Sequence, residues 1–183
     1  MNAVDEVFEL MERRGGDAYL GEEVSQLQHA LQAAHFAKES GGNATMVAAA
    51  LLHDVGHLLH KNGEGAASQG IDTHHEDEGY RWLLARFGQA VAEPVRLHVA
   101  AKRYLCATEP GYYEALSFAS KQSLALQGGA FSGSDLADFD ASPRGADALQ
   151  LRHWDDAAKV VDLQVPGLES YRELLEPLAT VIE

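Results

Sequence analysis

Residues 44–57 of the chain read ATMVAAALLHDVGH and are the most informative stretch of the sequence. Most of these positions are apolar, including Leu51 and Leu52. A helix formed by such a stretch is expected to lie in the hydrophobic core. The stretch runs straight into the polar pair His53 and Asp54. Because a buried polar pair needs partners, the sequence predicts that this helix carries an imidazole and a carboxylate to a partnered site inside the protein.

Helical spacing of apolar residues continues along the rest of the chain, and no stretch shows the two-residue alternation of a strand. Glycine pairs and proline-containing turns separate the helical stretches. The pattern predicts helices at residues 3–13, 21–38, 44–59, 73–87, 91–104, 117–126, 135–139, 145–159 and 168–178. We therefore expect an all-α fold, and the length of 183 residues suits a single domain.

The composition excludes nucleic-acid and membrane partners as expectations and favours a reducing compartment. The chain has 28 acidic and 14 basic side chains, a formal charge of −14, and no basic block, so nucleic acid is not an expected partner. The longest apolar run, residues 46–52, is far too short to span a membrane, and no membrane partner is expected. Cys106 is the only cysteine, which excludes an internal disulfide and favours a reducing cytoplasm.

Histidines are the most telling residue type, because most of the nine lie within predicted helices. A single histidine on an apolar face is more often a hydrogen-bonded core residue. A His-Asp pair joined by further helical histidines favours a metal site instead. Imidazoles and a carboxylate suit iron, zinc, manganese or nickel, and a shared aspartate can place one oxygen on each of two ions.

The order of these residues resembles the HD-domain superfamily of helical metalloproteins. The matching residues are His29, His53, Asp54, His75, His98 and Asp155. The histidines follow one another at intervals of 22 to 24 residues, and Asp155 comes 57 residues after His98. Such intervals place successive ligands on successive helices of a bundle with a central dinuclear metal site. His74 precedes His75 and is also a candidate ligand, although His75 fits the local pattern better because Gly79 follows one turn later.

Further segments are similar to the 2-amino-1-hydroxyethylphosphonate dioxygenase group of HD proteins. They are residues 19–29, residues 49–57, HVAAKRYL at 98–105, LQGG at 126–129 and RHWDD at 152–156, so the resemblance covers about residues 19–171. It implies a mixed-valence Fe(II)/Fe(III) di-iron oxygenase with O2 as co-substrate and no catalytic residue beyond the metal ligands. The implied reaction cleaves the carbon–phosphorus bond of a 1-hydroxy-2-(amino or trimethylammonio)ethylphosphonate.

The implied products are phosphate and glycine or glycine betaine, as in organophosphonate catabolism, and a separate hydroxylase would first install the C1 hydroxyl. Two other functions fit the same ligands: a metal-dependent phosphohydrolase, the commonest activity of HD proteins, and a metal-holding binding module. The sequence leaves open whether the nitrogen on C2 is a free amine or is fully methylated.

Two basic residues share helix faces with predicted ligands. Lys102 follows His98 by four residues, and Arg152 precedes Asp155 by three. In an acidic protein, two cations aimed at a metal centre predict an anionic substrate there. The alternative is that they form ion pairs with Asp54 or Asp155 and hold these ligands in place.

Three more residues are singled out by the resemblance. Ser120 matches a phosphonate-contacting serine, whereas by spacing alone it is an ordinary helical serine. Tyr19 and Glu22, near a predicted helix start, match a lid that leaves one iron when substrate arrives; by position alone they are a half-buried aromatic and a first-turn acid. Spacing alone singles out His57, which lies one turn after His53 and either binds substrate or orients a ligand.

Overall fold

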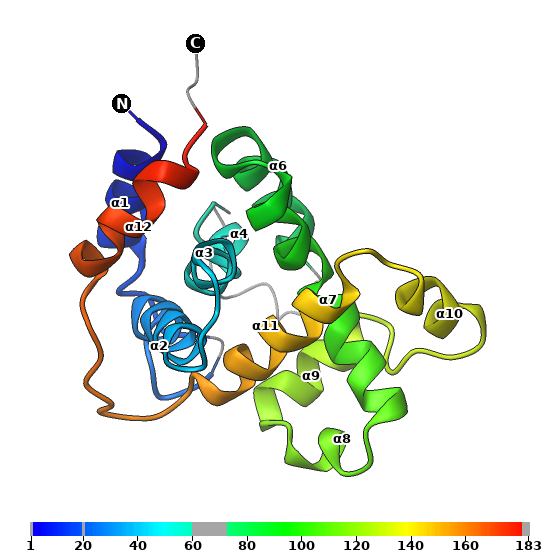
Figure 1. The fold of residues 1–183 in the computed structure, drawn as a ribbon. Helices are drawn as coiled ribbons and strands as arrows, with labels where there is room; N and C mark the ends of the chain where they lie inside the picture. Colours follow the sequence, from blue (N-terminus) through cyan, green and yellow to red (C-terminus); the bar gives the residue numbers. More distant parts are fainter. Residues whose placement is uncertain (1, 20, 60–72, 181–183) are drawn as a thin grey trace.

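The structure, a computed structural model, describes residues 2–19, 21–59 and 73–180 (Figure 1). The expected all-α fold is confirmed: within these residues there are helices and no strand, only an isolated bridge between Ala18 and Ser25. Every helix in these residues is too short or too polar to cross a bilayer.

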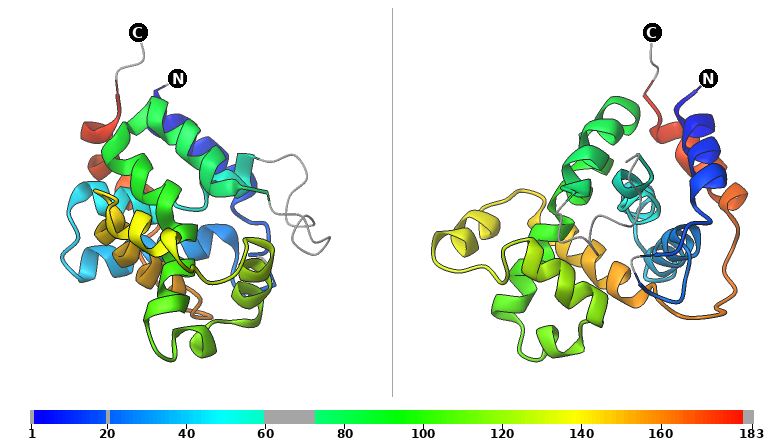
Figure 2. Two further views of the ribbon diagram at one scale, coloured as in Figure 1. Left: turned by 90° about the vertical axis from the view of Figure 1, so that its right-hand side faces the viewer. Right: turned by 180° about the vertical axis from the view of Figure 1, so that it is seen from behind.

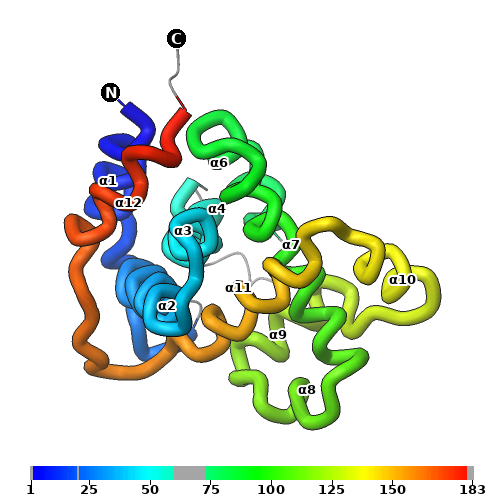
Figure 3. Tube along the Cα trace, viewed as in Figure 1, coloured from blue at the N-terminus to red at the C-terminus, as the bar shows by residue number. Residues whose placement is uncertain are grey.

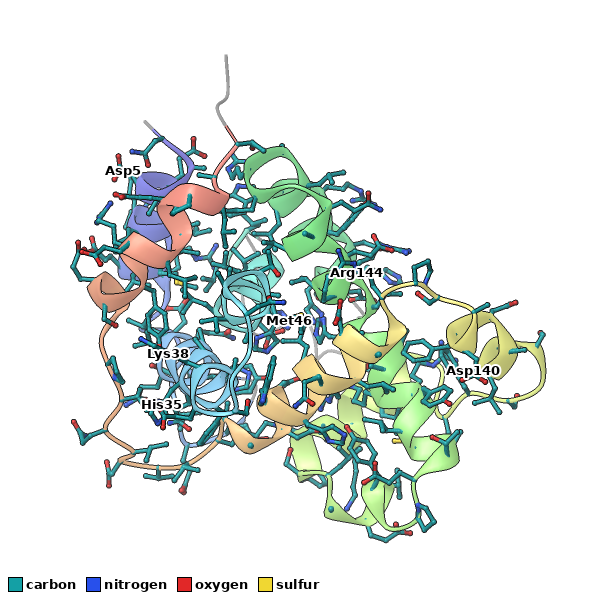
Figure 4. All side chains as sticks on the ribbon, viewed as in Figure 1. Asp5, His35, Lys38, Met46, Asp140 and Arg144 are labelled. Atoms are coloured by element: carbon teal, nitrogen blue, oxygen red, sulfur yellow. The ribbon has the colours of Figure 1, made fainter. Side chains whose placement is uncertain are left out.

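Five helices surround the centre of the molecule. They are α2 (Gln26–Glu39), α3 (Ala44–Leu52), α6 (His75–Phe87), α7 (Gln89–Thr108) and α11 (Gly145–Ala157). Helix α7 packs against α3, α6 and α11, while α2 packs against α3 and α11. Their apolar faces form one core, in which Leu51, Leu83 and Leu151 are 0–1% exposed. Figure 4 shows how side chains fill the space between these helices, Met46 of α3 among them.

The predicted single helix over residues 44–59 is wrong. Helix α3 ends at Leu52, and the short α4 (Val55–Leu59) begins after a turn at His53 and Asp54. Helix α4 then packs against α6 so closely that a Cβ on Gly56 would lie 2.0 Å from the carbonyl oxygen of His75. The turn therefore directs both polar side chains to the centre, and the glycine lets α6 approach.

The helix predicted from residue 21 begins later, at Gln26. Ser25 caps it: the Gln28 amide donates to the Ser25 hydroxyl over 3.1 Å, and the Ser25 amide donates to the Gln28 side chain over 2.8 Å. This reciprocal capping box satisfies two amides that would otherwise lack partners. Tyr19 and Glu22 consequently lie in the turn that precedes α2 rather than on the helix.

Short helices flank the central five on two sides. On one side lie α8 (Tyr112–Ala115), which the sequence did not predict, α9 (Phe118–Leu126) and α10 (Ser134–Asp140). Seen from behind, in the right-hand view of Figure 2, α10 (yellow) and α1 (Ala3–Arg14, blue) lie on opposite sides of the molecule. The helix predicted at 168–178 consists instead of η1 (Leu168–Tyr171), α12 (Arg172–Leu175) and η2 (Glu176–Leu178).

Both ends of the described chain leave on the same side (Figure 3). An ion pair of 3.0 Å joins Arg172 of α12 to Asp5 of α1. Two side-chain nitrogens of Arg86 on α6 bind the Glu6 carboxylate of α1. The backbone carbonyl of Arg86 accepts a hydrogen bond from the amide of Thr180. The terminal segments thus pack against the outside of the bundle and leave the inner helix faces to the site.

Candidate functional site

The six predicted metal ligands converge at the centre of the bundle, and each is at most 7% exposed. Four of the five central helices and the turn after α3 supply them: His29 on α2, His53 and Asp54 in the turn, His75 at the start of α6, His98 on α7 and Asp155 on α11. Residues spread over most of the chain therefore meet in one buried place.

A first donor group consists of His29, His53, Asp54 and Asp155. The Nε2 atoms of His29 and His53 lie 3.0 Å apart. Oδ2 of Asp54 lies 3.6 Å from His29 Nε2 and 3.4 Å from His53 Nε2. Oδ1 of Asp155 lies 3.4 Å and 3.8 Å from the same two nitrogens. Two nitrogens and two oxygens thus face one small volume.

A second donor group consists of Asp54, His75 and His98. The Nε2 atoms of His75 and His98 lie 3.2 Å apart. Oδ1 of Asp54 is 3.4 Å from His75 Nε2 and 3.5 Å from His98 Nε2. Asp54 therefore presents one carboxylate oxygen to each group. The first group has four donors and the second has three, so an ion in the second would keep more positions open.

Backbone carbonyls fix which nitrogen of each imidazole faces the centre. Nδ1 of His29 donates to the Ala158 carbonyl over 2.8 Å, and Nδ1 of His53 donates to that of Ala50 over 2.8 Å. Nδ1 of His98 donates to the Val95 carbonyl over 2.6 Å. In the neutral rings this leaves the lone pair of Nε2 pointing inward, as metal-binding histidines require.

The first donor group fits a metal ion on two grounds. Oδ1 of Asp155 is buried and has no hydrogen-bond partner, a costly state that a bound cation would relieve. When two imidazole nitrogens each lie ~2.1 Å from one metal ion and the angle between the two bonds is about a right angle, the nitrogens are about 3 Å apart. The Nε2 atoms of His29 and His53 are 3.0 Å apart. Without an ion, these facing lone pairs need a proton between them.

The electrostatics of the centre favour a positive charge between the carboxylates. Burial opposes protonation of His53, yet Asp54 and Asp155 outweigh it and raise the pKa of His53 well above its usual value. Burial likewise opposes ionisation of Asp54, but His53 and hydrogen bonds from His75 and His98 hold its pKa well below the usual range. The carboxylates are therefore ionised, and the cation that they attract can be a proton or a metal.

The structure distinguishes between the two adjacent histidines at the start of α6. His75 is buried with Nε2 in the second donor group. His74 is exposed and has a left-handed backbone, with φ of 48°. The left-handed turn points consecutive side chains in different directions, so only His75 reaches the centre.

An aromatic ring stacks on one histidine of each donor group. Tyr19 lies parallel to His29, with ring centroids 3.8 Å apart and planes at 17°. His57 lies parallel to His75, with 3.9 Å and 17°. Burial, the nearby carboxylates and a hydrogen bond with Asp54 raise the pKa of Tyr19 well above its usual value. Both stacked rings therefore restrict the orientation of a predicted ligand, and Tyr19 also brings a hydroxyl to Asp54.

The two predicted cations lie together between α7 and α11, but their partners differ. Nζ of Lys102 donates to the Ser123 hydroxyl over 2.9 Å. Arg152 is held by carboxylates: one nitrogen lies 2.7 Å from Oδ2 of Asp155, and two more bind Asp156. Arg152 thus has the ion pair considered as the alternative. Lys102 instead donates to a neutral hydroxyl and makes no ion pair with the described residues.

Ser120 and Glu22 meet through a residue that the sequence reasoning missed. Nζ of Lys159, just after α11, donates to the Ser120 hydroxyl over 2.9 Å and lies 3.6 Å from Oε1 of Glu22. Ser123 links this cluster to Lys102, because its hydroxyl donates to the Ser120 carbonyl over 3.1 Å. Nothing in the spacing of Lys159 signals this role, since it follows the end of its helix.

The sequence also did not predict two partners of Arg152, which are Asp156 and Tyr112. Asp156 binds Arg152 at i, i+4 spacing, which was visible in the sequence. The Tyr112 hydroxyl donates to Asp156 and accepts from Arg152 over 3.1 Å. Tyr112 lies on the unpredicted helix α8, 40 residues from Arg152 along the chain, so no local pattern points to it.

Comparisons with known proteins agree with this geometry. A family model described as the HD domain matches residues 27–119. Hydroxymethylphosphonate dioxygenase of Gimesia maris is 45% identical, over 94% of this chain and 86% of the relative. The 1-hydroxy-2-(trimethylamino)ethylphosphonate dioxygenase (glycine-betaine-forming) of Leisingera caerulea is 39% identical, over 96% and 89%. An uncharacterized protein of Acanthamoeba polyphaga mimivirus is 35% identical, over 94% and 80%.

Proposed function

Because this chain belongs to the HD-domain family, and within it to the group that includes the hydroxyphosphonate dioxygenases, we propose that it cleaves the carbon–phosphorus bond of a 1-hydroxyphosphonate with O2. One O2 is consumed, C1 becomes a carboxylate carbon, and inorganic phosphate is released. The reaction balances without another oxidant, since both atoms of O2 enter the products. A separate C1 hydroxylase and a cytoplasmic location remain predictions from the sequence.

The observation that carries the proposal is the pair of donor groups joined by Asp54. A shared carboxylate at the centre of four histidines supports two adjacent ions. Their unequal donor counts support two different tasks, because the second group leaves more positions for substrate and O2. We assign the ions as iron, held by His29, His53, Asp54 and Asp155 at one position and by Asp54, His75 and His98 at the other.

When bound, the iron pair supplies the activation of O2 that oxidises C1. The protein supplies binding, orientation and exclusion of water. The donor residues are 0–7% exposed, so the reacting atoms would lie in a place from which bulk water is excluded. Lys102 provides the cation for the phosphonate, and the Ser120 hydroxyl, which accepts from Lys159, can donate to it as well.

Arg152 acts mainly through Asp155 in this proposal. Its bond to Oδ2 leaves Oδ1 directed at His29 and His53, which fixes the carboxylate for the metal. His57 performs a similar task for His75 through the stacked rings. Tyr19 and Glu22 form the lid: the Glu22 amide donates to the Tyr19 carbonyl over 2.7 Å, so the two residues move together.

Metal content and stoichiometry test the proposal directly. Protein expressed with iron and purified without oxygen should contain about two iron ions per chain, as expected for a paired site. Given O2 and hydroxymethylphosphonate or a 2-substituted 1-hydroxyethylphosphonate, it should release one phosphate for each O2 consumed. Elemental analysis, an oxygen electrode and a phosphate assay provide the three measurements.

Either of two results would refute the oxygenase assignment. One is a single zinc ion and no iron after iron-replete expression. The other is oxygen-independent phosphate release from ordinary phosphate esters, which would establish a phosphohydrolase. Metal binding without turnover of either substrate class would favour the binding module.

The role given to Lys102 predicts a pH dependence of substrate affinity. Burial and, next, the charge of Arg152 lower the pKa of Lys102 to about 7. Below that pH the ammonium ion is present and binds the phosphonate; above it, binding must take up a proton. The affinity for hydroxymethylphosphonate should therefore fall as pH rises above 7, by up to about tenfold per pH unit. Anaerobic calorimetry in buffers of different ionisation enthalpy measures both affinity and proton uptake.

Lys102→Met should remove this decline and weaken binding at pH 6 by about 10–100-fold, the usual loss for a charge-assisted contact. Lys121→Met is the matched control, since Lys121 binds the Glu114 carbonyl on the outer side of α9. It should keep the wild-type profile. If Lys102→Met retained the same decline and proton uptake, another group would be responsible.

A further inference from the structure

Glu22, the acid of the proposed lid, already has a cationic partner. Its Oε1 lies 3.6 Å from Nζ of Lys159, and the two side chains are only 18% and 14% exposed. Oε1 is buried and has no hydrogen-bond partner, so the ammonium of Lys159 is its main compensation. The same ammonium is anchored by the Ser120 hydroxyl over 2.9 Å. Lys159 is thus fixed at the place where lid and phosphonate contacts meet.

The other described acids around the centre are also occupied. Asp54 faces both donor groups, Asp155 and Asp156 bind Arg152, and Glu76 lies 3.4 Å from Nδ1 of His75. A positively charged nitrogen on C2 of a substrate needs an acid or an open aromatic face. It would have to displace Lys159 from Glu22 and would then lie beside a second cation.

The aromatic residues near the centre do not provide an alternative. Tyr19 covers His29 with one face of its ring. The Tyr112 hydroxyl is engaged by Arg152 and Asp156. Trp154 points elsewhere, because its ring edge lies 3.3 Å from where a Cβ of Gly42 would be. These three rings face different partners, so they do not surround one quaternary ammonium.

We infer that Lys159 makes this site selective for 1-hydroxyphosphonates that carry no positive charge on C2. The inference rests on the proposed function and identifies its substrate class: hydroxymethylphosphonate and uncharged homologues. Lys159 acts by neutralising Glu22 and by repelling an ammonium ion. Its ammonium is also linked to Lys102 through Ser120 and Ser123, which suits a substrate whose only charges are those of the phosphonate.

A pair of ligands of nearly equal size isolates the effect of charge. They are 2-ammonio-1-hydroxyethylphosphonate and 1-hydroxypropylphosphonate, in which a methyl group replaces the ammonium. Dissociation constants are measured by anaerobic calorimetry on the iron-loaded protein, with hydroxymethylphosphonate as reference. The wild type should bind the uncharged ligand at least about tenfold more tightly, a difference of about 1.4 kcal/mol.

Lys159→Met should shift this ratio by about tenfold or more toward the ammonium ligand, because Glu22 becomes available. The double variant Glu22→Gln/Lys159→Met should lose that shift, which ties it to the carboxylate. Lys121→Met, the removal of a cation on the outer side of α9, should leave the wild-type ratio unchanged. Iron content and thermal unfolding, measured on each variant, show whether the centre is intact.

Different results would contradict the role of Lys159 and the proposed dioxygenase function. Equal binding of the two ligands by the wild type, or an unchanged ratio in Lys159→Met, would overturn the role of Lys159 while turnover continues. Binding of hydroxymethylphosphonate but of neither larger ligand would show selection by size and would also overturn it. Failure of all three to bind iron-loaded protein would refute the proposed function itself.

Discussion

Asp54→Ala is expected to empty both metal positions at once. Each carboxylate oxygen of Asp54 faces a different pair of imidazoles, so a single substitution removes a donor from both groups. It also removes the negative charge that compensates two cations within a few ångströms of each other. Loss of residues that merely orient ligands costs about 10–100-fold in metal affinity or activity, so loss of the bridge should cost more than about a thousandfold in activity.

Single-histidine variants provide the comparison. His98→Ala should lower the iron content from about two ions to about one, since it disturbs only the second donor group, and His29→Ala should do the same for the first. Asp147→Asn is the matched control, because Asp147 lies on α11 and pairs with Arg144 near the surface. It should retain both ions. Two irons in purified Asp54→Ala protein would contradict the bridging role.

Gly56→Ala is expected to disrupt the second donor group without touching any ligand side chain. The added Cβ would lie 2.0 Å from the His75 carbonyl oxygen and 2.7 Å from its carbonyl carbon, so the backbone that carries a ligand must move. Shifts beyond about 0.5 Å spoil a preorganised site. We expect about one iron per chain and activity lower by about a hundredfold or more.

The same variant should also be less stable. Overpacking typically costs about 1–3 kcal/mol, and for a chain of this size each kcal/mol lowers Tm by roughly 2–4 °C. Gly16→Ala is the control, since nothing lies within 4 Å of a Cβ added there. Circular dichroism and elemental analysis give both readings. If Gly56→Ala bound two irons with the wild-type Tm, the approach of α4 to α6 would not govern the position of His75.

Much of the fold and of the donor set could be predicted because the relevant signals are local. The apolar periodicity of each helix can be seen within its own segment. The resemblance over residues 19–171 is confirmed by relatives aligned over most of the chain. The break after Leu52 could not be predicted in this way. Apolar residues resume at Val55 after His53 and Asp54, so the pattern gives no sign of the break. The packing that accompanies it joins Gly56 of α4 to His75 of α6, 19 positions later.

The partners of the cations were harder to predict for the same reason. Spacing correctly placed Lys102 and Arg152 beside the donor groups. Spacing did not reveal that Arg152 is occupied by Asp155 and Asp156, nor that Lys159 reaches Glu22, 137 positions earlier. Such contacts depend on how α2, α9 and α11 pack, and a sequence pattern within one helix carries no information about them.

The distribution of the donors along the chain sets an order of assembly during synthesis. Asp54, His75 and His98 are all present once α7 has been made, whereas the first donor group waits for Asp155, 57 residues later. At about 5–20 residues per second the interval is roughly 3–11 s. Three donors of the first group, His29, His53 and Asp54, are synthesised earlier still. Both groups can therefore present three donors before Asp155 of α11 completes the first one.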